Sequence, residues 1–338
     1  MDRNLALEFV RVTEAAAISA SKWVGKGEAK KADAAAVDEM RDRFNQIDFA
    51  GTVVIGEGSK DESAELYNGE KVGRGWNKTG GVARPFMGNH RLRAADKSAR
   101  YTGPVMDLAI DPLECTDSVA YGRYNAITVI AAGSHGSLLN APDTYMEKIA
   151  AGPKAAKAIK LDAPTSVNIK NTAKALGKKV GDVTVCILER PRHERLISEV
   201  RKAGARVRLI TDGDVAGGIA PCLPESGIDL LMGIGASAEA VLAGVAIKIL
   251  GGQLLCRFKP KDEHHAQLVK KAGLNTTKIY NVNDLAKGKI LTFTATGVID
   301  GPLLSGVRYE GGKIITHSIV IRGQSGTIRY ITTHHHEK

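Results

Sequence analysis

The chain has 338 residues and a formal net charge of +10, and 43% of its residues are hydrophobic while 5% are aromatic. This length allows one large or two ordinary domains with a substantial core, and the 37 glycines are typical of α/β proteins with many tight turns. No apolar stretch approaches the roughly 18 residues that cross a bilayer, so we expect no membrane-spanning segment.

Cysteine spacing and the first residues predict the compartment. The four cysteines lie far apart, at positions 115, 186, 222 and 256, and form no CxxC pair, which favours a reducing, cytoplasmic setting. The N-terminal stretch mixes acidic, basic and apolar residues and lacks the continuous apolar segment of a signal peptide.

The positive charge is concentrated in one segment. Residues 74–103 hold seven basic residues and one acidic residue, so they carry +6 of the net charge of +10. Because the excess is local, the sequence argues against a nucleic-acid partner. We interpret 74–103 as a long exposed loop, either a solvated insertion or a segment that steers an anionic substrate.

Two helices are expected before the first strand. Apolar residues recur at helical spacing over 3–24, and a second helix is expected over about 34–44, with Asp33 as its N-cap. A β-branched strand over 51–55 follows and ends at Glu57, a carboxylate between two glycines. Small flanking residues let another group approach the backbone closely, although an exposed turn is the simpler interpretation.

The next strand leads into a short acidic segment. Residues 105–110 form an apolar run that we expect to end at Pro112, because proline cannot continue a central ladder. Asp111, Glu114 and Thr116 follow closely along the chain. Carboxylates beside a hydroxyl suit Mg²⁺ or Mn²⁺ holding a phosphate ester, whereas the simpler interpretation is an exposed acidic turn.

The middle of the chain predicts a hairpin and a domain boundary. Residues 125–132 read as a strand, 133–136 as a hairpin turn and 137–140 as the returning strand. Tyr145 suits either core packing or a substrate contact. The pattern weakens near 150–172, so we place a boundary there, with one domain over 1–160 and a second over 161–338.

Three strand–turn–helix units in the second half predict a parallel sheet with right-handed crossovers. The strands are expected over 183–188, 207–210 and 228–232. Ligands bind at the carboxyl ends of such strands. Those ends carry Arg190 and Arg192, Asp212 and Asp214, and Gly235 and Glu239. Arginines suit a phosphate and aspartates suit sugar hydroxyls.

The end of the chain is predicted to be mostly β structure. Strands are expected over 290–294, 306–309, 313–322 and 327–332, and the three histidines at 334–336 read as a frayed tail.

Ordered motifs along nearly the whole chain carry a family resemblance. They are ALEFVRVTEAAA, ADAAAVDEMR, GTVVIGEG, GEKVG, DPLECT, LNAPDTYMEK, ERPRH, DGDVA, MGIG and TATGV. With these motifs the chain resembles class II (GlpX-type) fructose-1,6-bisphosphatases, whose cyanobacterial members also accept sedoheptulose 1,7-bisphosphate.

The resemblance implies an α/β fold in α-β-α-β-α layers, related to inositol monophosphatases, and a cytoplasmic homo-oligomer (dimer or tetramer). It implies a phosphatase that uses Mn²⁺ or Mg²⁺, with two or more ions per site, to hydrolyse the 1-phosphate of a sugar bisphosphate. The implied metal ligands are Asp33, Glu57, Asp111, Glu114 and Glu239, in place of the N-cap role of Asp33. Glu57 and Thr116 are the implied catalytic residues. The implied substrate-binding residues are Glu114, Cys115, Thr116, Tyr145, Arg190, Pro191, Arg192, Asp212, Gly213, Asp214 and Gly235.

Three departures from the family pattern leave alternatives open. The family has glycine where this chain has Cys115, a basic insertion fills 74–103, and Ala29 replaces a usual lysine. If the turn at Cys115 needs positive φ, its Cβ costs about 1 kcal/mol or more. The alternatives are a related inositol-phosphate or nucleotide phosphatase, and a weakly active or non-catalytic homologue.

Overall fold

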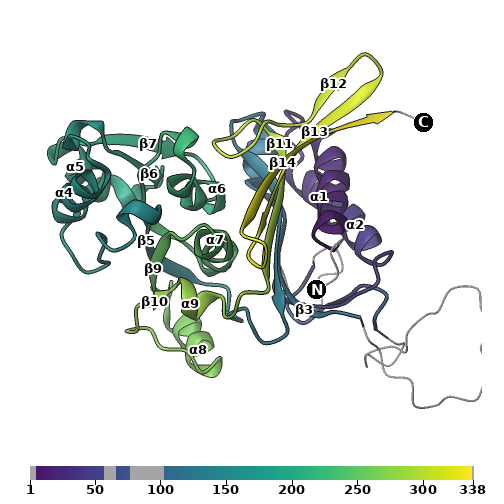
Figure 1. Ribbon diagram of the computed structural model, residues 1–338, viewed down its shortest axis with the longest axis horizontal. Helices are drawn as coiled ribbons and strands as arrows, with labels where there is room; N and C mark the ends of the chain where they lie inside the picture. Colours follow the sequence, from purple (N-terminus) through teal and green to yellow (C-terminus); the bar gives the residue numbers. More distant parts are fainter. Residues whose placement is uncertain (1–4, 57–65, 77–102, 337–338) are drawn as a thin grey trace, which may run out of the picture.

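The computed structural model describes residues 5–56, 66–76 and 103–336. Two β-sheets alternate with three helical layers, so the predicted α-β-α-β-α order is confirmed (Figure 1). Among the described helices, none combines the length and apolar character needed to cross a bilayer.

The first sheet is built from strands near both ends of the chain. Its order is β12-β13-β11-β4-β3-β1-β2, and β14 pairs with the other edge of β13. The strands are β1 (Ala50–Ile55), β2 (Lys71–Val72), β3 (Val105–Glu114), β4 (Ala126–Ser134), β11 (Leu291–Ile299), β12 (Arg308–Glu310), β13 (Lys313–Arg322) and β14 (Thr327–His336).

Two helices cover the outer face of this sheet. In α1 (Leu5–Ser21) and α2 (Ala29–Phe44) apolar residues recur on one face and are buried there. Phe9 of α1 packs edge-on against Phe44 of α2, with ring centroids 6.0 Å apart, and against Phe49 just before β1, at 5.4 Å. These contacts fix both helices on the sheet.

The second sheet has the order β10-β9-β5-β8-β6-β7. Its strands are β5 (Tyr145–Ala151), β6 (Thr184–Leu188), β7 (Arg206–Ile210), β8 (Leu230–Ala236), β9 (Gln253–Phe258) and β10 (Tyr280–Asn281). Strand β6 runs parallel to both β7 and β8, which confirms the predicted parallel units. Strands β5 and β9 run antiparallel to their neighbours, so the sheet is mixed. Helices α4 (Thr165–Leu176) and α5 (Glu194–Lys202) cover its outer face (Figure 1).

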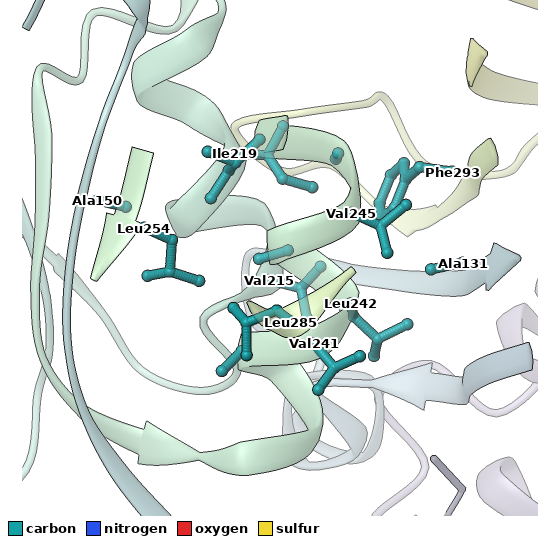
Figure 2. Packing of buried hydrophobic residues seen from close by; sticks show 14 of the residues in the cluster. Ala131, Ala150, Val215, Ile219, Val241, Leu242, Val245, Leu254, Leu285 and Phe293 are labelled. Carbon is teal, nitrogen blue, oxygen red and sulfur yellow. The ribbon is translucent and has the colours of Figure 1, made fainter. Parts of the chain in front are cut away.

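The largest hydrophobic core surrounds the helix that lies between the two sheets. In α7 (Ser237–Ile249) every residue from Ala240 to Ile247 is buried, as expected for a helix covered on all sides. Its side chains lie between Ala131 and Phe293 of the first sheet and Ala150 and Leu254 of the second (Figure 2). Helix α6 (Val215–Ile219) packs beside it. The other helices are α3 (Thr116–Tyr121), α8 (Glu263–Lys271) and α9 (Val282–Leu285).

Three local predictions were wrong. Strand β3 continues through Pro112 to Glu114, because a register shift between Asp111 and Glu114 places the proline at a bulge, where no ladder bond is lost. Residues 137–140 do not return along β4; Leu138 forms a bridge to Ala286 instead. The histidines at 334–336 belong to β14 and pair with residues 313–315 of β13, so they are not a frayed tail.

The sheets also divide the chain differently from a simple cut near residue 160. Strand β5 belongs to the second sheet, and the C-terminal strands β11 to β14 belong to the first. The two-domain division over 1–160 and 161–338 stays a prediction. Most of the basic segment 74–103, from 77 to 102, lies outside the described residues.

Candidate active site

The bulge in β3 aims Glu114 at the second half of the chain. Glu114 is buried, and its Oε1 accepts a hydrogen bond of 3.0 Å from the backbone N–H of Val215, the first residue of α6. Burial raises the pKa of Glu114; hydrogen bonds from Asp111 and Val215 lower it, while the nearby Asp214 and Asp212 carboxylates raise it. The acidic segment is therefore not an exposed turn: it lies where the two halves meet.

Cys115 has the left-handed conformation that glycine would adopt freely. Its φ is +75° and its ψ +50°, and it is the N-cap of α3. The side chain is buried, and its Sγ accepts a hydrogen bond of 3.3 Å from Nδ2 of Asn125. Burial, followed by the charges of Glu114 and Asp212, raises the pKa of the thiol well above its usual value. Without a cation the residue is therefore a neutral thiol.

Replacing this cysteine by glycine is expected to relieve the backbone. Cys115→Gly removes a left-handed penalty of about 1–2 kcal/mol and loses the burial of one small side chain, worth about 1 kcal/mol. We expect an unchanged or slightly higher melting temperature and a faster release of phosphate, because the carboxylates around the turn gain room. Thermal unfolding and steady-state rates of both proteins measure this. An unchanged or slower rate in the variant would show that the cysteine is accommodated.

Thr116 begins the helix that follows. Its Oγ1 donates a hydrogen bond of 2.9 Å to the carbonyl of Leu113. A hydroxyl that donates to the backbone presents its lone pairs to the other side, so it can accept a hydrogen bond from a water. The backbone N–H of Asp117, the next residue, is used by the Asp212 carboxylate.

A buried ion pair lies behind Glu114. Lys148 of β5 donates to both carboxylate oxygens of Asp214, at 2.8 and 2.9 Å, and both side chains are buried. Burial lowers the pKa of Lys148, but the Asp214 and Glu239 carboxylates raise it more, so the ammonium stays charged. Lys148 was missed in the sequence, where no strand was expected over 145–151 and only Tyr145 was singled out.

Glycines make room for these carboxylates. A Cβ on Gly213, which has φ +49°, would overlap Glu114 Oε1 and lie 2.5 Å from Cys115 Sγ. A Cβ on Gly235 would overlap Asp214 Oδ2 and lie 2.9 Å from Lys148 Nζ. Gly213 and Gly235, both predicted as substrate-binding residues, thus leave the space that the neighbouring carboxylates occupy because they have no side chain.

Glu239 on α7 completes the acidic cluster. The residue is half-buried, and loss of solvation around its carboxylate raises its pKa to about 8, with Lys148 lowering it and Glu114 and Asp214 raising it. Its Oε2 is buried and accepts no hydrogen bond from the described residues. A buried carboxylate oxygen among other carboxylates fits a divalent cation, since hard cations prefer such oxygens.

The described carboxylates do not by themselves form a complete cation cage. Within 5–56, 66–76 and 103–336, no three histidine, cysteine, aspartate or glutamate side chains converge as a metal-binding group. Glu57 lies outside the described residues. Asp33 lies within α2, whose N-cap is Glu28, so the N-cap prediction for Asp33 was wrong. Helix α2 packs against α3 and β3, which carry Thr116 and Glu114.

The predicted phosphate-binding arginines lie after β6, as expected. Arg190 pairs with Asp212 at 3.0 Å and also donates to the carbonyl of Thr211. Arg192 donates to the carbonyl of Ile234, and its guanidinium lies 4.8 Å from the centre of the Tyr145 ring. Pro191 begins the 3₁₀ turn between them, and Lys261 lies 4.6 Å from the same Tyr145 ring. Two cationic groups, Arg192 and Lys261, thus lie close to the Tyr145 ring.

His193 is a second residue that the sequence did not single out. It is buried; its Nδ1 lies 2.7 Å from the carbonyl of Leu188 and its Nε2 accepts 2.8 Å from the N–H of Ile234. These partners require a neutral ring with its proton on Nδ1. His193 therefore ties the turn after β6 to β8, and the ERPRH motif was the available signal.

Acid should weaken this tie. Burial lowers the pKa of His193 below its usual 6.5, so the folded chain excludes a proton that the unfolded chain binds. The contribution of neutral His193 to the stability of the fold is therefore complete above the ordinary pKa of 6.5. It is lost as the pH falls from 6.5 towards the lower pKa of the folded state. We expect the melting temperature of the wild type to fall more steeply from about pH 7 to about pH 5 than that of His193→Gln. Equal slopes would contradict the assignment.

The carboxylates of the β3 bulge lie beside the turns that carry Asp212, Asp214 and Arg190. Carboxylates suit a divalent cation and guanidinium groups suit a phosphate. The model of the bacterial fructose-1,6-bisphosphatases encoded by glpX matches residues 3–335. The chain belongs to this family of phosphatases.

Named relatives agree with the family. The chain is 40% identical over 349 aligned positions to the fructose-1,6-bisphosphatase 1 class 2 of Escherichia coli K12, with 99% of this chain and 96% of the relative covered. The fructose-1,6-bisphosphatase class 2 of Shigella flexneri matches with the same identity and coverage.

Proposed function

We propose that this chain is a phosphoric monoester hydrolase that removes the 1-phosphate of fructose 1,6-bisphosphate, giving fructose 6-phosphate and phosphate. The family match and the buried carboxylate cluster beside Thr116 support this activity. The single observation that carries it is the meeting of Glu114 on β3 with the strand-end turn at Val215, because this places the acidic segment beside the arginines that suit a second phosphate.

The cation site would be formed by carboxylates. We propose Asp33, Glu57, Asp111, Glu114 and Glu239 as ligands for Mn²⁺ or Mg²⁺, two or more per site. A bound divalent cation would polarise the phosphoryl oxygens and lower the pKa of a bound water. The buried side chain of Glu114 and the buried Oε2 of Glu239 support this set, since carboxylate oxygens removed from water are stabilised by a nearby cation.

The chain's own residues would bind and orient the substrate. Arg190 and Arg192 would hold the far phosphate, and Asp212 would fix Arg190 through their ion pair. Tyr145 would lie along the sugar, positioned by Arg192. Thr116 would accept a hydrogen bond from the attacking water and so orient it for in-line attack.

A metal-by-substrate assay tests the proposal. We expect phosphate release from fructose 1,6-bisphosphate with Mn²⁺ or Mg²⁺ and little release from an inositol monophosphate, which would leave the arginines unused. Sedoheptulose 1,7-bisphosphate belongs in the same panel, because it also carries two phosphates. No release from fructose 1,6-bisphosphate with either ion would contradict the function.

We also propose a homo-oligomer, a dimer or tetramer, on the strength of the family resemblance. Strand β14 offers one surface: among the described strands it pairs only with β13, and it exposes Ile328 and Tyr330. An open edge strand is a template for another chain. Light scattering should give two or four times the chain mass of 35.9 kDa, and the mass of one chain would contradict this.

A further inference from the structure

The Lys148–Asp214 ion pair is a positioning device for the active site, we infer, and it holds the turn after β7 so that Glu114 is presented correctly for a divalent cation. This inference rests on the proposed function only where it concerns the rate of phosphate release. The contacts that carry it join three separate parts of the chain.

The first step is the anchoring of Asp214. Both of its carboxylate oxygens accept hydrogen bonds from Lys148 Nζ, at 2.8 and 2.9 Å. Lys148 and Asp214 are almost inaccessible, with side-chain exposures of 1% and 5%. With both oxygens engaged and no exposed edge, Asp214 is poorly placed to bind a sugar hydroxyl. Its side chain instead fixes its own backbone.

The second step passes from that backbone to Glu114. The residue after Asp214 is Val215, whose N–H donates 3.0 Å to Glu114 Oε1. The carbonyl of Asp214 accepts from Gly218 and so starts α6 at this point. Moving the Asp214 side chain would therefore move the amide that orients Glu114.

The third step concerns the other side of the same turn. Asp212, two residues before Asp214, binds Arg190 at 3.0 Å. One anchored turn thus orients a carboxylate on the first sheet and an arginine on the second. Side chains that position a metal ligand without touching the metal matter for binding. Removing one commonly lowers metal affinity or activity by about 10- to 100-fold.

The test is the affinity for Mn²⁺ alone, measured by calorimetry, together with thermal unfolding and the separate kcat and KM for fructose 1,6-bisphosphate. Lys148→Met keeps the apolar stem and removes the charge. We expect Mn²⁺ affinity and kcat to fall by about 10- to 100-fold. Wild-type Mn²⁺ affinity in this variant would overturn the inference.

Lys148→Met leaves a buried aspartate unpaired and could unfold the chain. The double variant Lys148→Met/Asp214→Leu removes both charges, and apolar replacement of a whole buried pair is often neutral for stability. We expect it to melt near the wild type yet to keep weak Mn²⁺ binding. Recovery of stability and Mn²⁺ affinity together would show that the pair is merely structural and would overturn the inference.

The chain offers a control ion pair of the same residue types, although its lysine is more exposed, at 39%. Lys178 pairs with Asp229 at 2.6 Å, and Asp229 lies before β8, at the opposite end of the parallel strands. Lys178→Met should lower the melting temperature and leave Mn²⁺ affinity and kcat unchanged. An equal loss of Mn²⁺ affinity in this control would overturn the inference, because any broken ion pair would then suffice.

The two proposals fail separately. If the wild type releases no phosphate from fructose 1,6-bisphosphate but Lys148→Met still weakens Mn²⁺ binding, the proposed substrate is wrong and the positioning role stands. If the wild type is active and Lys148→Met matches it in Mn²⁺ affinity and kcat, the positioning role is wrong and the function stands.

Discussion

Glu114→Gln is expected to abolish activity while leaving the fold intact. The carboxylate is buried beside Asp111 and Asp214, and its Oε1 accepts from the Val215 N–H. A glutamine oxygen can accept the same hydrogen bond, so the turn stays in place. The amide carries no charge for a divalent cation, and kcat/KM should fall by roughly 10³-fold or more.

The stability of the cation-free protein should change in the opposite direction. Burial raises the pKa of Glu114, and Asp214 and Asp212 raise it further, so the ionised carboxylate is costly in the fold without a cation. Removing that charge should leave the melting temperature of the cation-free variant equal to or above that of the wild type. Added Mn²⁺ should then raise the melting temperature of the wild type and have little effect on the variant.

Glu194→Gln is a suitable control, because Glu194 is an exposed carboxylate at the start of α5. It should match the wild type in rate and in the response to Mn²⁺. If Glu114→Gln retained a tenth or so of the wild-type kcat/KM, Glu114 would not be an essential ligand, since a lost ligand charge costs far more.

Part of this site could be predicted from local patterns and general rules of topology. Polar residues followed three strands in the order strand, turn, helix, and parallel strands bring their carboxyl ends to one edge. The rule placed Arg190, Asp212 and Gly235 near one another, and β6 indeed lies parallel to β7 and β8. No detail of the loops was needed.

Other features depended on distant parts of the chain. Glu147 and Lys148 are adjacent in β5, so they face opposite sides of the sheet, and one of them must face the helix layer. The sequence of β5 cannot tell which, because the covering helix α7 begins at Ser237, far along the chain. The partner of Lys148, Asp214, is equally remote.

The course of β3 through Pro112 could not be predicted from the sequence for a different reason. Proline removes one ladder bond, which predicts an end to a regular strand. A bulge changes that argument, since the extra residues between Asp111 and Glu114 have no cross-strand partner to lose. The site is built on this irregularity: without it, Glu114 would keep the regular alternation of the strand.

Gly235→Ala is expected to be strongly damaging to both stability and activity. An added Cβ would overlap Asp214 Oδ2 and lie 2.9 Å from Lys148 Nζ. Neither group can retreat, because both are buried and bound to each other. Breaking a buried ion pair costs about 3–5 kcal/mol, so the melting temperature should fall sharply.

Activity should fall further than stability alone would explain. At a temperature where the variant is still folded, a displaced Asp214 shifts the Val215 N–H that orients Glu114, so kcat should fall by about 10-fold or more. Circular dichroism establishes the folded fraction, and steady-state rates at that temperature give kcat.

Gly181→Ala separates this effect from the general cost of losing a glycine. The nearest atom to a Cβ at Gly181 is the Gly204 carbonyl oxygen at 3.7 Å, an ordinary contact, so this variant should match the wild type in melting temperature and rate. A Gly235→Ala protein that also melts and turns over like the wild type would mean that the ion pair tolerates displacement. Asp214 would then be free to adopt other positions, and the turn at Val215 would have to be held by something other than Lys148.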